Sequence, residues 1–307
     1  MTASQSPRFG TVVTAMATPF DESGELDLDG AVALARYLVA HGSEGLVVTG
    51  STGEVATLSD GEREALWRAV STAVDVPVVA GATSNDTRHS IELTKLATSS
   101  GVDGILAVAP YYNRPSQAGI AEHFRAIAAA TPLPVILYDI PVRTGRKIAS
   151  ETILSLAAEV ENIVGLKDAA GDAPATARLL ARAPADFECY SGDDLMTLPL
   201  LSVGAVGMIG VATHWCGVEC GEMIERFRSG DVRGSLQIAR ALIASFVFES
   251  GDEAPNPVPL KAVLRVLGLP AGECRLPMGP TPAGLEERAR TVLAELDAWR
   301  HARGAGG

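Results

Sequence analysis

The sequence contains little lysine and no long hydrophobic run. Only four of its 307 residues are lysines, so each lysine can be considered individually. No stretch approaches the roughly 18 consecutive apolar residues that a membrane-spanning helix requires. The N-terminal segment MTASQSPRFG lacks the basic region followed by an apolar run that is typical of a signal peptide. We therefore expect a cytoplasmic protein that does not enter a membrane.

Basic residues are also scarce relative to acidic ones. The chain has 25 Lys and Arg against 37 Asp and Glu, which gives a formal net charge of -12. A surface of this charge repels nucleic acid and anionic membranes, so neither is expected as a partner. An anionic substrate would need a local group of positive charges to bind.

Motifs for metals and nucleotides are missing as well. There is no HExxH, no Walker loop and no GxGxxG that opens a helix after a strand. Cys216 and Cys220 are four residues apart, which is not the spacing of a zinc knuckle, and the four cysteines are interpreted as reduced, buried thiols. The five histidines are scattered, and no carboxylate or cysteine partner is evident for any of them. We predict no metal site.

Short apolar runs alternate with amphipathic stretches along most of the chain. The runs are Val/Ile/Leu-rich, as expected of parallel strands that are buried on both faces. The predicted strands are residues 11–17, 45–49, 77–82, 104–109, 134–139, 163–167, 187–191 and 206–211. The predicted helices are residues 26–39, 60–74, 87–99, 116–129, 150–158, 173–182, 194–201 and 215–227. Eight strand–helix units predict an α/β fold, a (β/α)8 TIM barrel that spans residues 1–230.

The last part of the chain has a different pattern. Only helices are predicted there, at residues 232–248, 259–267 and 282–300, with a loop rich in proline and acidic residues after the first of them. We therefore expect a C-terminal three-helix extension, residues 231–307, that packs on the barrel. The final segment HARGAGG is expected to be frayed.

Lys167 differs from the other lysines in its position. It ends the apolar run NIVGLK, and the C-terminal ends of barrel strands carry the catalytic groups of such enzymes. Apolar surroundings favour a neutral amine, which can attack a ketone and form an iminium ion. A structural ion pair with Asp168 is the alternative. Lys95 and Lys147 are predicted to be exposed, whereas Lys261 opens a helix and could cap or pair.

Further polar residues follow other predicted strands. The loop GSTGE contains Ser51 and Thr52, and its backbone N–H groups could bind a carboxylate, although a plain tight turn explains the motif equally well. Tyr138 in VILYDIP lies at the end of the fifth predicted strand and could relay a proton, or simply fill the core. Arg143 in IPVRTG suits a carboxylate clamp. The pair Tyr111–Tyr112 could belong to the site or to an interface.

In combination these residues resemble the dihydrodipicolinate synthase family, whose members are 4-hydroxy-tetrahydrodipicolinate synthases. This family belongs to the N-acetylneuraminate lyase superfamily of class I aldolases. The resemblance covers residues 10–281, and its segments are GTVVTAMATPF, GSTGE, PYYNRPSQAG, VILYDIPVRTG, IVGLKDAAG, YSGDD, GMIGV, PNPVPLK and RLPM.

The resemblance implies a role for each matching residue. Lys167 would form a Schiff base with pyruvate, and Tyr138 would donate and accept protons. Ser51 and Tyr112 would complete a proton relay, with Tyr112 reaching in from a neighbouring subunit of a homotetramer built as a dimer of dimers. The iminium ion is itself the electron sink, so no cofactor is required.

The resemblance also implies how two substrates are held. Thr52 would bind the carboxylate of pyruvate, and the backbone of Ile209 would also contact pyruvate. Arg143 would receive the carboxylate of aspartate semialdehyde. The enzyme would then be a lyase in the diaminopimelate pathway of lysine biosynthesis.

Many relatives are inhibited by lysine, and this chain departs from them in the pocket concerned. Val55, Asp60 and His89 stand where the family usually has serine, histidine and glutamate, whereas Tyr111 and Asn85 remain. We predict weak or absent inhibition by lysine.

Two other functions are compatible with parts of this pattern. Ser51, where synthases usually have threonine, also occurs in relatives that cleave 2-keto-3-deoxy sugar acids or N-acetylneuraminate. Those relatives generally lack an arginine at the position of Arg143. A non-catalytic ligand sensor or scaffold is disfavoured because the reactive residues occur together: Lys167, Tyr138, Ser51, Thr52 and Tyr112.

Overall fold

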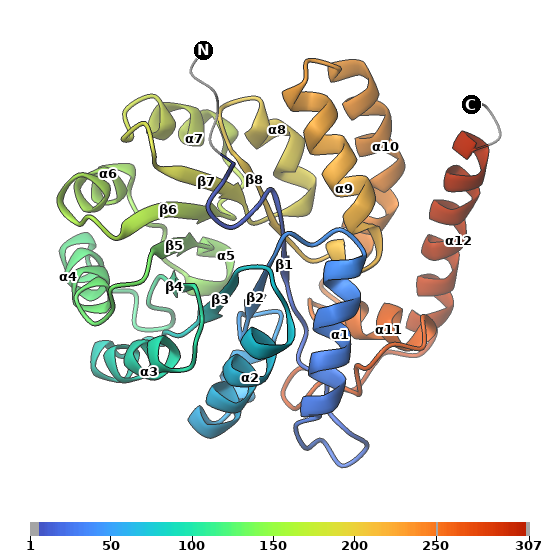
Figure 1. Ribbon diagram of the computed structural model, residues 1–307, viewed down its shortest axis with the longest axis horizontal. Helices are drawn as coiled ribbons and strands as arrows, with labels where there is room; N and C mark the ends of the chain where they lie inside the picture. The colour runs from blue at the N-terminus through green and yellow to red at the C-terminus, as the bar shows by residue number, and fades with distance from the viewer. Residues whose placement is uncertain (1–5, 250, 305–307) are drawn as a thin grey trace.

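Eight parallel strands close into a barrel in the computed structural model, which describes residues 6–249 and 251–304. The last strand pairs with the first, so the sheet has no free edge. Helices surround the barrel on the outside (Figure 1). The predicted (β/α)8 fold is confirmed.

The strands are short and almost completely buried. They are β1 (Val12–Ala15), β2 (Gly45–Val48), β3 (Val78–Gly81), β4 (Gly104–Val108), β5 (Val135–Asp139), β6 (Ile163–Asp168), β7 (Glu188–Ser191) and β8 (Gly207–Gly210). Seven lie within the predicted runs, and β6 extends one residue further. The predictions were longer because apolar residues continue into the buried loops at both ends of each strand.

The helices between the strands also agree with the pattern. They are α1 (Leu28–Ala40), α2 (Asp60–Ala73), α3 (Thr87–Ser99), α4 (Gln117–Ala128), α6 (Ser150–Glu159), α7 (Ala173–Leu180), α8 (Thr197–Leu201) and α9 (Thr213–Arg228). A further short helix, α5 (Pro141–Thr144), was not predicted, since four residues are too few for a helical period. The predicted helix 194–201 begins instead with the 3-10 turn η2 (Asp194–Met196).

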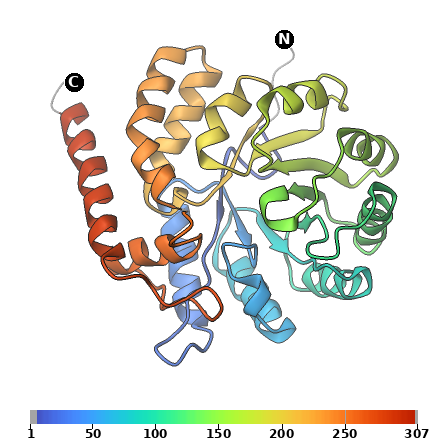
Figure 2. The ribbon, with the colours of Figure 1, turned by 180° about the vertical axis from the view of Figure 1, so that it is seen from behind.

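Three more helices lie to one side of the barrel, next to α1 and α9 (Figures 1 and 2). They are α10 (Val232–Phe248), α11 (Val258–Val266) and α12 (Leu285–Gly304), and they confirm the helical extension. Trp215 of α9 donates to Ser245 of α10 at 3.0 Å. The prediction of a frayed tail is wrong for residues 301–304, which belong to α12, and residues 305–307 lie outside the described part. That residues 231–307 form a domain of their own stays a prediction.

The interior of the barrel is apolar at its N-terminal end. The ring of Phe9 lies there, and an added Cβ at Gly104, the first residue of β4, would come within 2.7 Å of it. Side chains of successive strands fill the space above: Val13, Ala15, Val47, Val79, Leu106, Ile136, Tyr190 and Ile209. Within the described residues this filling closes the N-terminal end of the barrel, so a ligand would bind at the C-terminal end.

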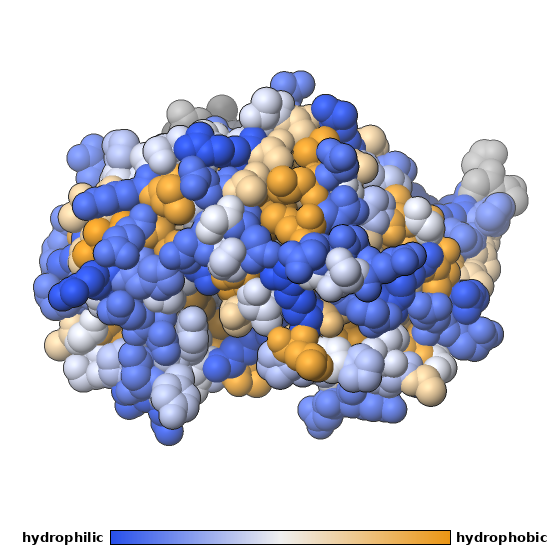
Figure 3. Space-filling view, turned by 90° about the horizontal axis from the view of Figure 1, so that it is seen from below, coloured by the Kyte–Doolittle hydropathy of each residue, from blue (hydrophilic) through white to orange (hydrophobic). Residues whose placement is uncertain are grey.

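The outer surface is mostly hydrophilic, with hydrophobic side chains in small groups on the face seen in Figure 3. No helix within the described residues is long and apolar enough to cross a membrane. Cys189, Cys216 and Cys220 are buried free thiols, as predicted, whereas Cys274 is only half-buried.

Candidate active site

Lys167 lies at the C-terminal end of β6 and is only 4% exposed. The strand register places it beside Tyr138 of β5, and its Nζ atom is 4.5 Å from the centre of the Tyr138 ring. The alternative of an ion pair with Asp168 is not observed among the described residues. That carboxylate instead accepts hydrogen bonds from the Ala170 amide at 2.9 Å and the Thr176 hydroxyl at 2.6 Å. Lys167 is therefore a buried amine that lies over the ring of a tyrosine.

Gly192 provides the space that the Lys167 side chain occupies. This glycine follows β7 in the segment YSGDD, and an added Cβ would lie 2.9 Å from Lys167 Cγ and 3.0 Å from Cε. Any larger residue would displace the lysine or its neighbour Ala169, which is also at 3.0 Å. The glycine of the YSGDD motif is thus explained by its close packing against the Lys167 side chain.

A cavity of about 270 Å³ opens at the same end of the barrel. Three of the predicted site residues line it, namely Ser51, Tyr138 and Arg143. Tyr111 contributes to the wall from the loop after β4, and Pro277 and Met278 from the C-terminal segment complete it. The structure therefore brings together residues that are far apart in the sequence around one small, mostly apolar space.

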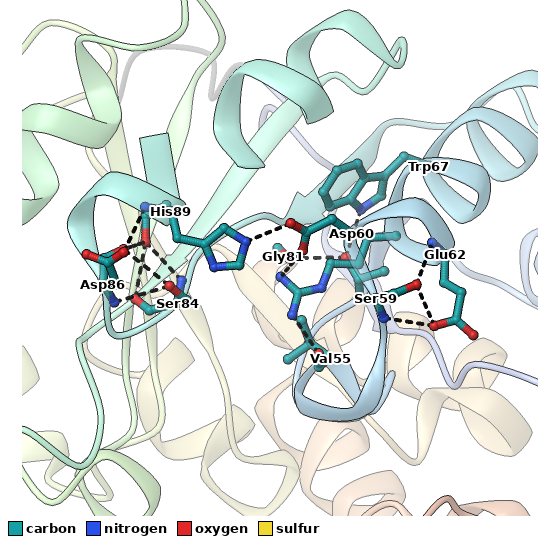
Figure 4. Close-up of polar contacts among 12 residues, drawn as sticks. Val55, Ser59, Asp60, Glu62, Trp67, Gly81, Ser84, Asp86 and His89 are labelled. Atoms are coloured by element: carbon teal, nitrogen blue, oxygen red, sulfur yellow. Dashed lines mark hydrogen bonds and ion pairs between the residues drawn. The ribbon is translucent and has the colours of Figure 1, made fainter. Parts of the chain in front are cut away.

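The loop GSTGE forms one side of this cavity and is tightly constrained. Thr49, just before the loop, and Glu54, its last residue, have φ values of 59° and 56°, a left-handed conformation that is unusual for residues other than glycine. The indole N–H of Trp67 in α2 donates to the Thr49 hydroxyl at 2.7 Å (Figure 4). An added Cβ at Gly81 would come within 2.3 Å of the Thr49 carbonyl, so only glycine fits beside the loop.

The C-terminal extension reaches the same loop through Asn256, Lys261 and the backbone amide of Arg275, which donates to a Glu54 carboxylate oxygen at 2.8 Å. Asn256 donates from Nδ2 to the Thr52 hydroxyl at 3.0 Å, and its carbonyl accepts from Arg143 Nη2 at 3.0 Å. Lys261 of α11 forms an ion pair with Glu54 at 2.6 Å, and both side chains are completely buried. The prediction that Lys261 could pair is confirmed. The role of Asn256 was missed, because the segment PNPVPLK shows no chemistry until it is folded against the barrel.

The remaining lysines behave as predicted, with one addition. Lys95 and Lys147 are exposed. Lys147 also forms an ion pair with Asp139 at 2.8 Å, and Asp139 is buried directly after Tyr138. Burial raises the pKa of the Asp139 carboxyl above its ordinary value, although the neighbouring Lys147 ammonium opposes this shift.

Four predicted site residues do not line this cavity in their own chain, namely Lys167, Thr52, Tyr112 and Ile209. Tyr112 is 90% exposed and has a left-handed backbone with φ of 71°. Ile209 is buried in β8, in the same interior cluster as Tyr138. Their roles in binding and proton transfer stay predictions.

The expectation that no histidine has a carboxylate partner is wrong for His89. Its Nε2 atom lies 2.8 Å from a carboxylate oxygen of Asp60, and Figure 4 shows this contact between the starts of α3 and α2. The two residues are 29 positions apart, so no local pattern signals the pair. Nearby, Arg63 donates to the Val55 carbonyl at 2.8 Å. Within residues 6–249 and 251–304, no group of three or more His, Cys, Asp or Glu side chains could hold a metal ion.

Comparisons with known proteins agree with this architecture over nearly the whole chain. The 4-hydroxy-tetrahydrodipicolinate synthase of Moorella thermoacetica is 49% identical over 290 residues, which cover 94% of this chain and 98% of that protein. The synthase of Acidothermus cellulolyticus is also 49% identical, over 99% of this chain and 98% of that protein.

A solved structure described as the synthase from Cyanidioschyzon merolae with lysine bound superimposes with a TM-score of 0.91. It is 44% identical in sequence, and the match covers 94% of this chain and 98% of the other. The model of the Dihydrodipicolinate synthetase family matches residues 8–296. The chain belongs to the dihydrodipicolinate synthetase family.

Proposed function

We propose that this chain is a 4-hydroxy-tetrahydrodipicolinate synthase, a lyase of the class I aldolase type that condenses pyruvate with L-aspartate 4-semialdehyde in diaminopimelate and lysine biosynthesis. The observation that carries the proposal is the buried amine of Lys167, 4.5 Å from the Tyr138 ring at the catalytic end of the barrel. The family membership and the synthases that are 49% identical support the same activity.

The reaction follows from this amine. Lys167 attacks the keto carbon of pyruvate and expels water, which forms an iminium ion. Loss of a methyl proton gives an enamine, and its carbon attacks the aldehyde of the second substrate. The amino group of that substrate then attacks the iminium carbon, which closes the ring and releases Lys167. Tyr138 moves the protons in these steps, and its position beside Lys167 supports this role.

The other predicted residues have supporting roles in the proposal. Ser51 continues the proton relay from Tyr138, and both residues line the cavity. Thr52 and Ile209 hold pyruvate, while Arg143, which lines the cavity, binds the carboxylate of aspartate semialdehyde. Carbon–carbon bond formation then uses only protein groups, so the proposal includes no cofactor.

The proposal includes a homotetramer in the cytoplasm in which Tyr112 completes the relay of a neighbouring subunit. Its support is the 90% exposure of this tyrosine, which has no place in the cavity of its own chain. Sedimentation analysis tests the assembly. A Tyr112→Phe variant should lose about tenfold or more in kcat, because general acid–base groups contribute about 100-fold or more.

Borohydride reduction in the presence of pyruvate tests the central step. The proposal predicts a stable adduct on the peptide that contains Lys167, and no adduct in a Lys167→Met variant. Absence of an adduct with the unmodified chain at every pH near neutral would refute Schiff-base chemistry.

A substrate panel tests the identity of the aldehyde. Arg143→Ala should greatly reduce condensation with aspartate semialdehyde while the adduct with pyruvate still forms, since the arginine binds only the second substrate. Unchanged activity of this variant, or a preference of the unmodified enzyme for sugar aldehydes, would point to the sugar-acid aldolases instead.

A further inference from the structure

Asn256 connects two residues that the proposed function assigns to different substrates. It lies just before α11 in the C-terminal extension and is 7% exposed. Its side-chain Nδ2 atom is 3.0 Å from the Thr52 hydroxyl, whereas its backbone carbonyl accepts from Arg143 at 3.0 Å. Side chain and backbone therefore act on different partners and can be separated by substitution.

The bond from Asn256 determines how the Thr52 hydroxyl can be used. An amide nitrogen can only donate, so it occupies a lone pair of the hydroxyl oxygen. The hydroxyl proton of Thr52 then has to be donated to a different group. A hydroxyl held in this way can donate its proton to an acceptor. A carboxylate offers two acceptor oxygens and is therefore a suitable partner.

The geometry of the extension keeps this bond in place. Lys261, five residues after Asn256, forms its buried 2.6 Å ion pair with Glu54, two residues after Thr52. The C-terminal segment thus contacts the loop at two neighbouring residues, Thr52 and Glu54. Such a double contact limits the freedom of the Thr52 side chain, which is 3% exposed.

We propose that Asn256 is a positioning residue that turns the Thr52 hydroxyl into a hydrogen-bond donor for the carboxylate of the 2-oxo acid. Asn256 itself does not touch the substrate. The inference rests on the proposed function, in which Thr52 receives pyruvate. It assigns to the C-terminal extension a part in the affinity for the first substrate.

Two substitutions of Asn256 separate donation from packing. Asn256→Ala removes the donor and should raise the KM for pyruvate about tenfold, the equivalent of one hydrogen bond to a charged group. Asn256→Asp has the same shape, but its carboxylate can only accept a hydrogen bond. It would therefore accept the bond from the Thr52 hydroxyl and also add a negative charge, so the KM for pyruvate should rise further. In the Ala variant, kcat and the KM for aspartate semialdehyde should change less than twofold, because Arg143 bonds to the backbone carbonyl.

A double-mutant cycle with Thr52→Val decides whether Asn256 acts through the hydroxyl. In the Thr52→Val background, Asn256→Ala should have no further effect on the KM for pyruvate. A rise of both KM values in parallel, or the same tenfold rise without the Thr52 hydroxyl, would show a merely structural role and overturn the inference.

Borohydride trapping distinguishes this inference from the proposed function. If the unmodified chain forms no adduct, the proposed function fails and the inference with it. If the unmodified chain is trapped, and Asn256→Ala and the unmodified chain are half-trapped at the same pyruvate concentration, only the inference is overturned. If half-trapping of Asn256→Ala needs about tenfold more pyruvate than half-trapping of the unmodified chain, and the far-UV circular dichroism is unchanged, the inference is supported.

Discussion

Lys167 has its buried position because Gly192 has no side chain. Substitution Gly192→Ala would place a Cβ 2.9 Å from Lys167 Cγ, closer than such atoms approach without a shift of one of them. Since misplacement of a reacting group by about 1 Å can cost roughly 100-fold in rate, we expect kcat to fall by about that factor. Steady-state kinetics and the yield of the borohydride adduct measure the effect.

Gly61→Ala is the matched control for this experiment. Gly61 is in the first turn of α2, and an added Cβ there meets nothing within 4 Å. This variant should keep the full kcat and gain slightly in stability, as alanine is the better helix former. Equal kcat values for the two variants would mean that Gly192 does not position the lysine.

At the scale of elements, the contact between the loop after β2 and helix α11 depends on one buried ion pair. Lys261→Met should lower the free energy of unfolding by about 3–5 kcal/mol, because the Glu54 carboxylate would be left buried without its counter-ion. The double variant Glu54→Gln with Lys261→Met should recover much of this loss, since no charge remains uncompensated. Urea denaturation measures both, and Lys95→Met on the surface is the control.

We expect the residues at the starts of α2 and α3 to make this chain insensitive to lysine. The carboxylate of Asp60 is already paired with His89 at 2.8 Å, and Val55 offers no polar side chain for an amino acid ligand. We therefore expect half-inhibition only above millimolar lysine, measured in an initial-rate assay. Sub-millimolar half-inhibition would contradict this prediction.

Introducing the residue types that are usual in the family gives a gain-of-function control for lysine inhibition. The triple variant Val55→Ser, Asp60→His and His89→Glu restores the residue types that relatives usually have at these positions. It should be inhibited at lower lysine concentrations than the unmodified enzyme.

At the scale of the whole molecule, two buried histidines couple folding to pH. Burial lowers the pKa of His123 in α4 and of His214 in α9 from 6.5 to about 4. In the unfolded chain both side chains take up protons below about pH 6.5, whereas the folded protein keeps them neutral. Their contribution to stability is thus present above pH 6.5 and lost as the pH falls through 4.

Urea denaturation between pH 7 and pH 4 checks this expectation. Each histidine should account for up to about 3 kcal/mol of the loss, because folding lowers its pKa from 6.5 to about 4. Substitution His123→Asn should make the free energy of unfolding less dependent on pH in this window, and the exposed His301→Asn should not. A pH dependence that is identical in all three proteins would rule out this origin.

Local patterns in the sequence determined the barrel and the position of Lys167 within it. Eight continuous apolar runs alternating with amphipathic helices are typical of a (β/α)8 barrel, and the strand ends then place Lys167 and Tyr138 side by side at its C-terminal end. The resemblance of the motifs added Ser51, Thr52 and Arg143, and the structure places Ser51 and Arg143 on one cavity with Tyr138.

Only the tertiary structure decided which distant loops meet. Asn256 is 204 residues from Thr52, and Lys261 is similarly far from Glu54, so no periodicity or spacing relates them. The pair His89–Asp60 arises in the same way from the first turns of two neighbouring helices, α3 and α2. Hydrophobic patterning specifies which face of an element is buried, but the partners of individual polar groups depend on how loops and the C-terminal extension close over the barrel.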